Sequence, residues 1–508
     1  MGWLQSLIAR FMPAPAPVAD EPPAPQGLRV RRFDAAQTNR LNEAHWSGAT
    51  GQHINADLVA DLETLRARCA YEISNNPLVA GVVATHACDI VGPDGPLLEV
   101  QSDDKSYNQA VEDLWAEWFL MPDQLGQLTG AEMLKLFCRL WWDKGEHLCQ
   151  EVDGIDVPAG EPSLRYLAID PDRLRTQPSS QGLANVALGV RRTERGIVTG
   201  YEIERPQNYG AYELSTGEFD EIPADEMIHG YQQIQPGQVR GIPILAPVLQ
   251  VVADLRDFDA SVLDAARLAA SQGIVWWTAN DSVDVWDCQP GETAEIERNM
   301  QTTGPPGWRP ELIDPKQPST NYTEFRMERL RELGRPVAMP LMKIMLGSEK
   351  HSFSSARMDG QNYSRAIESY QHMLEHGTVR RWLRSLLLEA ALLQRRGEFR
   401  LPKAPARVRY RFTWAKQPSA DPMKEASAER IRVLETRTLP FAEACRLHGL
   451  DPERVIDSWA ETNRLLAAAG MPPLALPGTI DPPTDDADGS DNETGDNETS
   501  ETEETVEA

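Results

Sequence analysis

The sequence lacks the cysteine spacing of a disulfide framework or a zinc ribbon. Its 508 residues include six cysteines, none of them in a C-x-x-C pair, which indicates a reducing compartment. It also lacks a run of about 18 apolar residues, the length that a membrane-spanning helix needs. The first twelve residues, "MGWLQSLIARFM", have no positively charged stretch before an apolar run. The sequence therefore predicts neither export nor a membrane anchor.

Basic residues are scarce overall, since the net charge is -27. A conventional nucleic-acid-binding protein would be basic. The charge is uneven, however: residues 479–508 carry twelve acidic residues and no basic one, which predicts a disordered acidic tail. Residues 326–365 hold eight basic and four acidic residues, and residues 380–411 hold ten and two. The chain is therefore acidic overall but contains a basic stripe, which consists of residues 326–365 and 380–411.

Catalytic motifs are also missing: there is no phosphate-binding G-x-x-x-x-G-K-[ST], no G-x-G-x-x-G after a strand and no G-x-S-x-G. The one candidate is "HMLEH", His372 to His376, which matches the H-x-x-E-H zinc pattern and places two histidines on one helix face. Glu389, a conceivable third ligand, would sit about three to four turns along the same helix and could not close the site. We therefore predict an exposed helix face, no cofactor, no metal and no enzyme, with a zinc hydrolase as an alternative.

Two further patterns favour structure over chemistry. His147 and Cys149 are two residues apart, which is typical of a strand rather than of a metal site. The pairs Trp141–Trp142 and Trp276–Trp277 could stack on bases, but such residues more often pack in a core or at a subunit boundary.

Periodicity predicts an α+β chain that is mainly helical. Before residue 272, the predicted elements are helices over 56–73, 79–88, 106–119, 129–142 and 245–271, a tight turn between short strands around Asp94, and a strand-rich region over 146–229. An irregular Trp-, Gly- and Pro-rich module follows over 273–321. Helices are then predicted over 322–333, 355–395, 422–435, 441–448 and 452–469, with a strand over 406–414.

The stretch "GSEKHSFSSAR", Gly347 to Arg357, lies between two helical segments and offers almost nothing to a core. Its Ser, Lys, His and Arg side chains suit hydrogen bonding to phosphate. The stretch also lies inside the basic stripe.

Several stretches, in this order, resemble the portal proteins of tailed bacteriophages, in the lambda-type branch. They are "LRARCAYEISNNPLVAGVV", "DIVGPDGPLLEVQ", "IPADEMIHGYQQIQPGQVRGIPILAPVLQVV", "SFSSARMDGQNY" and "HGLDPERVIDSWAETNRLLAAAGM". Together they cover roughly residues 31–471, and the Ile-His run with Gly-Gln-x-Arg-Gly-Ile-Pro is the most specific. The Trp-rich insert after Gly273 matches nothing in the family's pattern.

The resemblance implies the phage portal fold, assembled as a cyclic ring of twelve. The implied regions are an N-terminal arm and Pro-rich linker (1–30), an α+β wing (31–241), a stem helix (242–272), a clip (273–321), a returning stem helix (322–337), a channel-loop region (338–357), a long wing helix and strand (358–416), a helical crown (417–477) and a disordered acidic tail (478–508).

The resemblance further implies a structural protein of the virion that is assembled in the bacterial cytoplasm. It would sit at one capsid vertex, pass double-stranded DNA without sequence specificity during packaging and ejection, and dock the terminase large subunit, the major capsid or scaffold protein and the head-tail connector. Contacts to DNA are expected from Lys350, His351, Ser352, Ser354 and Arg357. Few charges per subunit would keep phosphate contacts weak and exchangeable. A cytosolic scaffold that binds a basic partner through the acidic tail is the other alternative.

Overall fold

The computed structural model of the chain describes residues 43–44, 49, 51–155, 157–158, 160–206, 215–270, 274–277, 309–312, 321–347, 353–416, 422–448 and 450–472. The chain divides into two compact units, Met1–His53 and Ile54–Ala508. The predicted N-terminal linker, the acidic tail and most of the module over 273–321 lie outside the described residues. All elements named below belong to the second unit.

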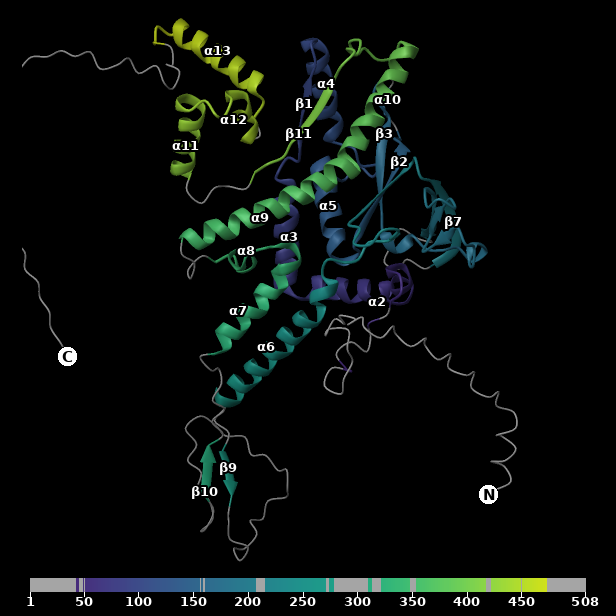
Figure 1. Cartoon of the computed structure of the whole chain (residues 1–508), viewed down its shortest axis with the longest axis vertical. Helices are drawn as coiled ribbons and strands as arrows, with labels where there is room; N and C mark the ends of the chain where they lie inside the picture. Colours follow the sequence, from purple (N-terminus) through teal and green to yellow (C-terminus); the bar gives the residue numbers. More distant parts are fainter. Residues whose placement is uncertain are drawn as a thin grey trace, which may run out of the picture. The chain divides into compact units, whose positions relative to one another are not determined.

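Among the described residues, four helices open this unit (Figure 1), and short polar side chains cap the starts of three of them. The four helices are α2 (Ile54–Asn75), α3 (Pro77–Val91), α4 (Lys105–Phe119) and α5 (Gly130–Asp143). The Asn76 side chain accepts hydrogen bonds from two amides of the first turn of α3, and Pro77 occupies a position that needs no amide donor. Thr129 and Glu132 form a capping box at α5. The sequence "NNP", Asn75 to Pro77, therefore ends one helix and caps the next.

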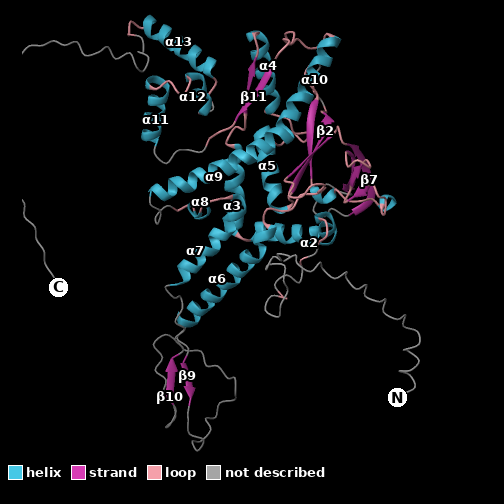
Figure 2. Ribbon diagram, viewed as in Figure 1, coloured by secondary structure: helices cyan, strands magenta, loops and turns pink. Residues whose placement is uncertain are grey.

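In the part of the chain that the structure describes, antiparallel strands form four small sheets (Figure 2). The strands are β1 (Leu97–Gln101), β2 (Glu146–Asp153), β3 (Leu164–Ile169), β4 (Val186–Ala187), β5 (Val190–Arg192), β6 (Val198–Pro206), β7 (Ser215–Pro223), β8 (Met227–Tyr231), β9 (Ile274–Trp277), β10 (Arg309–Leu312) and β11 (Arg409–Thr413). The sheets are ordered β3–β2–β8, β4–β5–β6–β7, β1–β11 and β10–β9. Because Leu97 lies opposite Thr413, the chain after the long helix returns to the first strand.

The second half of the chain is mainly helical. Its helices are α6 (Leu249–Ala270), α7 (Asn321–Gly334), α8 (Leu341–Met345), α9 (Phe353–Leu374), α10 (Arg380–Arg396), α11 (Pro422–Arg430), α12 (Phe441–Leu447) and α13 (Pro452–Ala468). Ion pairs connect α12 to earlier elements: Arg446 lies 2.7 Å from Glu99 of β1, and Glu443 lies 2.9 Å from Arg411 of β11. The prediction of an α+β, mainly helical chain is confirmed.

A wide turn interrupts the long helix predicted over 355–395. α9 passes into the π-helical turn Glu375–Val379 and then into α10. The core-facing residues are Tyr363, Ile367 and Leu374 in α9 and Trp382, Leu386 and Ala390 in α10. In an unbroken α-helix the second set would point roughly 120° away from the first, at 100° per residue. The π-turn accommodates one extra residue, so both sets reach the same core cluster.

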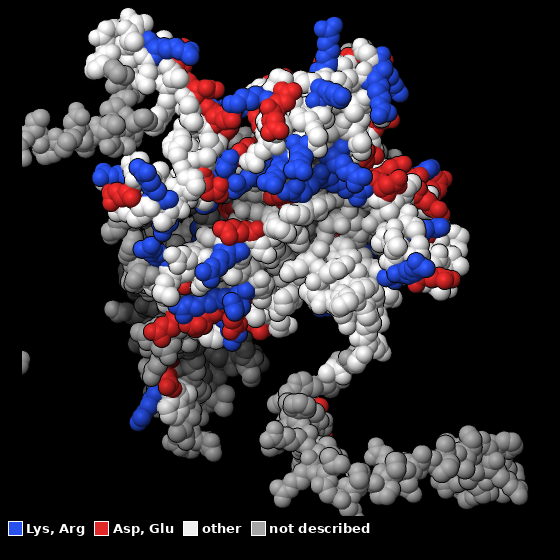
Figure 3. Space-filling view, turned by 45° about the horizontal axis from the view of Figure 1, so that its top comes forward, with Lys and Arg blue, Asp and Glu red and all other residues white. Residues whose placement is uncertain are grey.

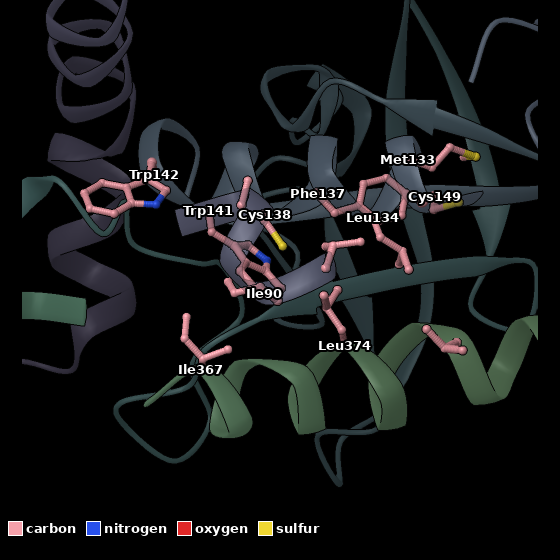
Figure 4. Close-up of a cluster of buried hydrophobic side chains, with 14 of the residues drawn as sticks. Ile90, Met133, Leu134, Phe137, Cys138, Trp141, Trp142, Cys149, Ile367 and Leu374 are labelled. Carbon is pink, nitrogen blue, oxygen red and sulfur yellow. The ribbon is translucent and has the colours of Figure 1, made fainter. Parts of the chain in front are cut away.

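The largest core cluster surrounds α5 (Figure 4). Trp141 and Trp142 are 2% and 0% exposed, and their indole nitrogens donate hydrogen bonds of 3.1 Å to Nδ1 of His147 and of His86. The interpretation of this tryptophan pair as packing residues is confirmed. The predicted strand around His147 is also confirmed, because His147 and Cys149 are buried in β2.

Burial controls the charge of these core groups. It lowers the pKa of His86 to about 3 and that of His147 to about 3. His147 also bonds Thr378 of the π-turn through Nε2, at 3.0 Å. Asp143 lies at the end of α5, and because it is an acid, burial shifts its pKa in the opposite direction from that of a histidine, upward to about 6. The fold thus favours the neutral form of all three side chains.

A buried ionic cluster joins α2, β2, β8 and the loop before α6. Glu146, whose side chain is 0% exposed, lies 2.8 Å from Arg66, 2.6 Å from Arg240 and 2.9 Å from His229, and it accepts the Gly241 amide at 2.7 Å. Burial alone would raise the pKa of Glu146, but Arg240, His229 and Arg66 hold it well below its ordinary value.

This cluster explains the stretch "GQVRGIP". Arg240 also donates to the carbonyls of Pro171, Leu174 and Leu188, at 2.7 to 2.9 Å. A Cβ at residue 241 would lie 2.0 Å from the carbonyl oxygen of Gly145, so only glycine fits there. The most specific stretch of the family resemblance therefore has a structural role, because Arg240 and Gly241 hold the loop before α6 against β2.

Two boundary predictions are wrong. The turn at Asp94 does not separate two strands, because Ile90 and Val91 complete the buried face of α3 and only Leu97–Gln101 forms a strand. The short helix α8 was not predicted, since five residues are too few to show a helical period. Within the described ranges, no helix is long and apolar enough to cross a membrane.

Candidate functional site

The predicted channel loop lies between α8 and α9. Lys350, His351 and Ser352 lie outside the described residues. Ser354 and Arg357 belong to the first two turns of α9 rather than to a loop, because α9 begins at Phe353. No Gly or Pro occurs between Phe353 and Arg357, so nothing in that stretch stops the helix from starting early. Arg357 is exposed to solvent.

A compact turn leads into the loop. Gly334 ends α7, and a Cβ at this position would lie 2.4 Å from the carbonyl oxygen of Met339. Leu346 then ends α8 with φ 50°, in the left-handed region, and the Gly347 amide donates to the Met342 carbonyl at 3.2 Å. The close backbone approach at Gly334 fixes the turn between α7 and α8, and the left-handed conformation of Leu346 ends α8 before the loop.

One carboxylate of α3 holds both sides of the loop. The ammonium of Lys343 in α8 lies 3.1 Å from each oxygen of Asp89, and the hydroxyl of Tyr363 in α9 donates to the same carboxylate at 3.0 Å. The Asp89 side chain is 17% exposed. Burial and the neighbouring Asp89 raise the pKa of Tyr363, so the phenol stays a donor. We call these three residues the Asp89 anchor; it ties the segments before and after the loop to α3.

An exposed polar face continues from the loop along α9. Arg357, Gln361, Arg365 and His372 are all exposed and recur at intervals that share one helix face. Glu368 lies on the same face. Two arginines against one carboxylate give this face a mildly positive balance, which suits weak contacts to a polyanion.

The two histidines and the glutamate of "HMLEH" do not gather around one point where a metal ion could bind. The rings of His372 and His376 stack with centroids 3.9 Å apart, while Glu375 pairs with Arg380. Glu389, the conceivable third ligand, instead accepts hydrogen bonds from the amides of Ser163 and Leu164 at 2.7 and 2.8 Å. Among the residues that the structure describes, no group of three or more His, Cys, Asp or Glu side chains could hold a metal ion.

An acidic face characterises α6, the helix predicted as the stem. Asp254, Asp257 and Asp264 are exposed and share one face of this helix, and arginines of the same helix pair with two of them at 3.1 and 3.7 Å. Asp259 fixes α7 beside α6, since it lies 2.8 Å from the Tyr322 hydroxyl and 3.3 Å from the Arg326 guanidinium. The helical pair therefore presents carboxylates outward while a polar contact holds its two members together.

Spacing could not have revealed the Asp89 anchor, because 254 and 274 residues separate Asp89 from Lys343 and Tyr363. Arg365 is different. It lies four residues after Gln361 and eight after Arg357, and this helical interval was readable from the sequence.

The comparisons with known proteins are as follows. The family model described as "Phage portal protein, lambda family" matches residues 39–371. No curated protein matches the chain.

Several solved structures are similar to the chain. A chain in the virion of a native gene transfer agent particle is 16% identical, with a TM-score of 0.46, over 80% of this chain and 98% of that one. A chain in the neck of an empty gene transfer agent particle is 15% identical, with a TM-score of 0.45 and the same coverage. An HK97-family phage portal protein from Corynebacterium diphtheriae is 10% identical, with a TM-score of 0.32, over 59% of this chain and 87% of that one.

Proposed function

Because the chain belongs to the lambda family of phage portal proteins, we propose that twelve copies form the ring through which double-stranded DNA enters and leaves the capsid. The observation that carries this proposal is the family match over residues 39–371, which extends past the loop and into α9. Under this proposal the protein is a structural part of the virion and has no active site. The ring is closed and built from head-to-tail contacts.

The Asp89 anchor supports the assignment of the loop as the channel contact. A loop that touches moving DNA experiences force along the channel, and the loop ends must transmit that force to the body. Lys343 and Tyr363 both bond Asp89, so one largely buried carboxylate on α3 holds the segments on both sides of the loop. The charge-assisted contact to Lys343 is stronger than a neutral hydrogen bond.

Charge placement supports passage rather than tight binding. Lys350 and Arg357 provide few cations per subunit, and the exposed face of α6 carries three carboxylates, two of them paired with arginines, so it would not bind a duplex tightly. A strongly basic loop in twelve copies would trap DNA, because each neutralised phosphate releases counterions. A twelvefold ring cannot match the symmetry of a double helix, so we infer sequence-independent translocation.

The regional assignments follow from the same proposal. The elements from α2 to β8 form the wing, α6 and α7 the stem, and α11 to α13 the crown. The clip is assigned to residues 273–321, of which the structure describes only β9 and β10. The terminase large subunit, the capsid or scaffold protein and the head-tail connector are the proposed partners, with assembly in the bacterial cytoplasm.

Ring formation tests the proposal. Twelve chains of 56.6 kDa would give a particle of about 680 kDa, measurable by negative-stain microscopy together with a mass determination. Rings of twelve or thirteen subunits would both support the proposal. Monomers or dimers at every protein and salt concentration tested would contradict it.

A further inference from the structure

Outside the loop, the described surface carries a second concentration of basic side chains, on α10 and the segment that leads to β11. Figure 3 shows Lys and Arg gathered on this part of the molecule. We call the following exposed residues the basic band: Arg384, Arg395, Arg396, Arg400, Lys403, Arg407 and Arg409. Within the described ranges, none of them forms an ion pair, unlike Arg380 and Arg411 beside them. The basic band is therefore uncompensated by the part of the chain that the structure describes.

An apolar groove of about 360 Å³ runs beside the basic band. It is lined by Leu387, Leu388 and Ala391 of α10 and by Leu401, Pro402 and Ala404 of the following segment. Leu388 is 58% exposed and Leu392, next to the groove in sequence, is 54% exposed. Arg384 also contributes to the lining, so the groove combines an apolar floor with a cationic edge.

The C-terminal segment, residues 473–508, has the complementary composition. It begins with apolar residues at Leu474, Leu476 and Ile480, and the twelve acidic residues follow without a basic one. A polyanion such as duplex DNA matches the basic band but has no apolar part for the groove. The order of apolar residues and then carboxylates in the C-terminal segment fits both features.

The C-terminal segment is long enough to reach the basic band. α12 and β11 are joined by the ion pair between Glu443 and Arg411, and the band leads directly into β11. The segment follows α13, and its 36 residues could span up to about 120 Å when extended. Tethering on the same chain raises the effective concentration to about the millimolar range.

We propose that the chain's own C-terminal segment docks on this surface, with Leu474 and Leu476 in the groove and the acidic residues along the basic band. The docked segment covers the band and keeps other polyanions off it. This inference does not rest on ring formation, so it can fail while the proposed function stands.

Zero-length cross-linking of the full-length protein tests the docking. A carbodiimide joins lysine amines to carboxylates in contact, and Lys403 is the only lysine of the basic band. Lys416 is an exposed lysine outside the band and serves as the matched control, while the Lys105–Glu453 pair, 3.1 Å apart, is the positive control. Lys403 should join the tail carboxylates about tenfold more than Lys416 does, because docking adds to the tethering that both lysines share.

One double variant and one salt condition separate the contribution of the groove from that of the charge. Leu388→Glu with Ala391→Glu, both at exposed positions, should reduce the yield at Lys403 to that of Lys416. About 1 M NaCl should also weaken the contact by screening. Equal yields at the two lysines in the unmodified protein would overturn the proposal, and an undiminished yield in the groove variant would remove the groove from it.

Isotope mixing identifies the source of the tail. In an equal mixture of ¹⁴N- and ¹⁵N-labelled protein, cross-linked peptides should carry one isotope throughout if each chain docks its own segment. Peptides of mixed isotope would overturn docking on the same chain. Mixed-isotope cross-links from Lys403 to carboxylates of α6 would show that a second copy covers the band instead.

Discussion

Replacement of Glu146 by Gln is expected to destabilise the protein severely. The side chain is 0% exposed and receives donors from Arg66, Arg240, His229 and the Gly241 amide. Glutamine of the same shape keeps only one acceptor oxygen, and its NH₂ group would face donors. The Arg240 guanidinium, 3% exposed at the side chain, would then lose its ion-pair partner, and Arg66 would keep only the partly exposed Asp172, at 3.2 Å.

Loss of one member of a buried ion pair costs about 3–5 kcal/mol, which lowers the folding equilibrium constant by a factor of about 10² to 10⁴. The matched control is Glu453→Gln, which removes the exposed pair with Lys105, 67% and 80% exposed, and should cost at most about 1 kcal/mol. Urea unfolding followed by tryptophan fluorescence, at several protein concentrations, measures both variants. Equal midpoints for the two variants would refute the view that this cluster holds α2, β2, β8 and the loop before α6 together.

Three other changes follow from the structure. Tyr363→Phe removes one bond of the Asp89 anchor without a change of shape; rings should form normally, with an apparent loss of about 1 kcal/mol, while particles show reduced DNA packaging. Lys350→Glu with Arg357→Glu should leave rings intact and lower the genome content of assembled particles, and normal packaging and ejection would exclude these residues from the channel. On acidification, His86 and His147 take up protons only on unfolding, because their folded pKa of about 3 lies below the ordinary 6.5. Stability is thus complete above pH 6.5 and is lost toward pH 3, by about 1.4 kcal/mol per pH unit for each histidine. The carboxyl at the end of α5, with its raised pKa, offsets about one histidine between pH 6 and 3.8, so a midpoint that is unchanged from pH 7 to 4 would contradict this reasoning.

Most elements were predictable from the sequence because their signals are local. Asn76 with Pro77, and Thr129 with Glu132, fix helix starts within a few residues of the chain. The Asp89 anchor and the Glu146 cluster depend on side chains that only the fold brings together. Spacing along the chain carries no trace of such contacts, so the sequence predicted loop residues as DNA contacts but did not predict that Lys343 and Tyr363 anchor the loop.

The π-turn was, in contrast, visible in the sequence as a break in phase. Buried positions of α9 and α10 each keep a helical interval, but the two series do not share one count. The prediction of one unbroken helix over 355–395 treats both series as one and overlooks the offset.

Because of this offset, the long helix contains one residue more than a regular α-helix would need to connect the two buried faces. Gly377 lies in the π-turn, is exposed, and has open space where a Cβ would be. Its deletion would restore the ordinary helical count and still direct Trp382 and Leu386 at the core. A deletion of one residue anywhere else in α9 or α10 would rotate the remainder of that helix by about 100° and expose its apolar side. The length of this helix is therefore free to change at one place along its course.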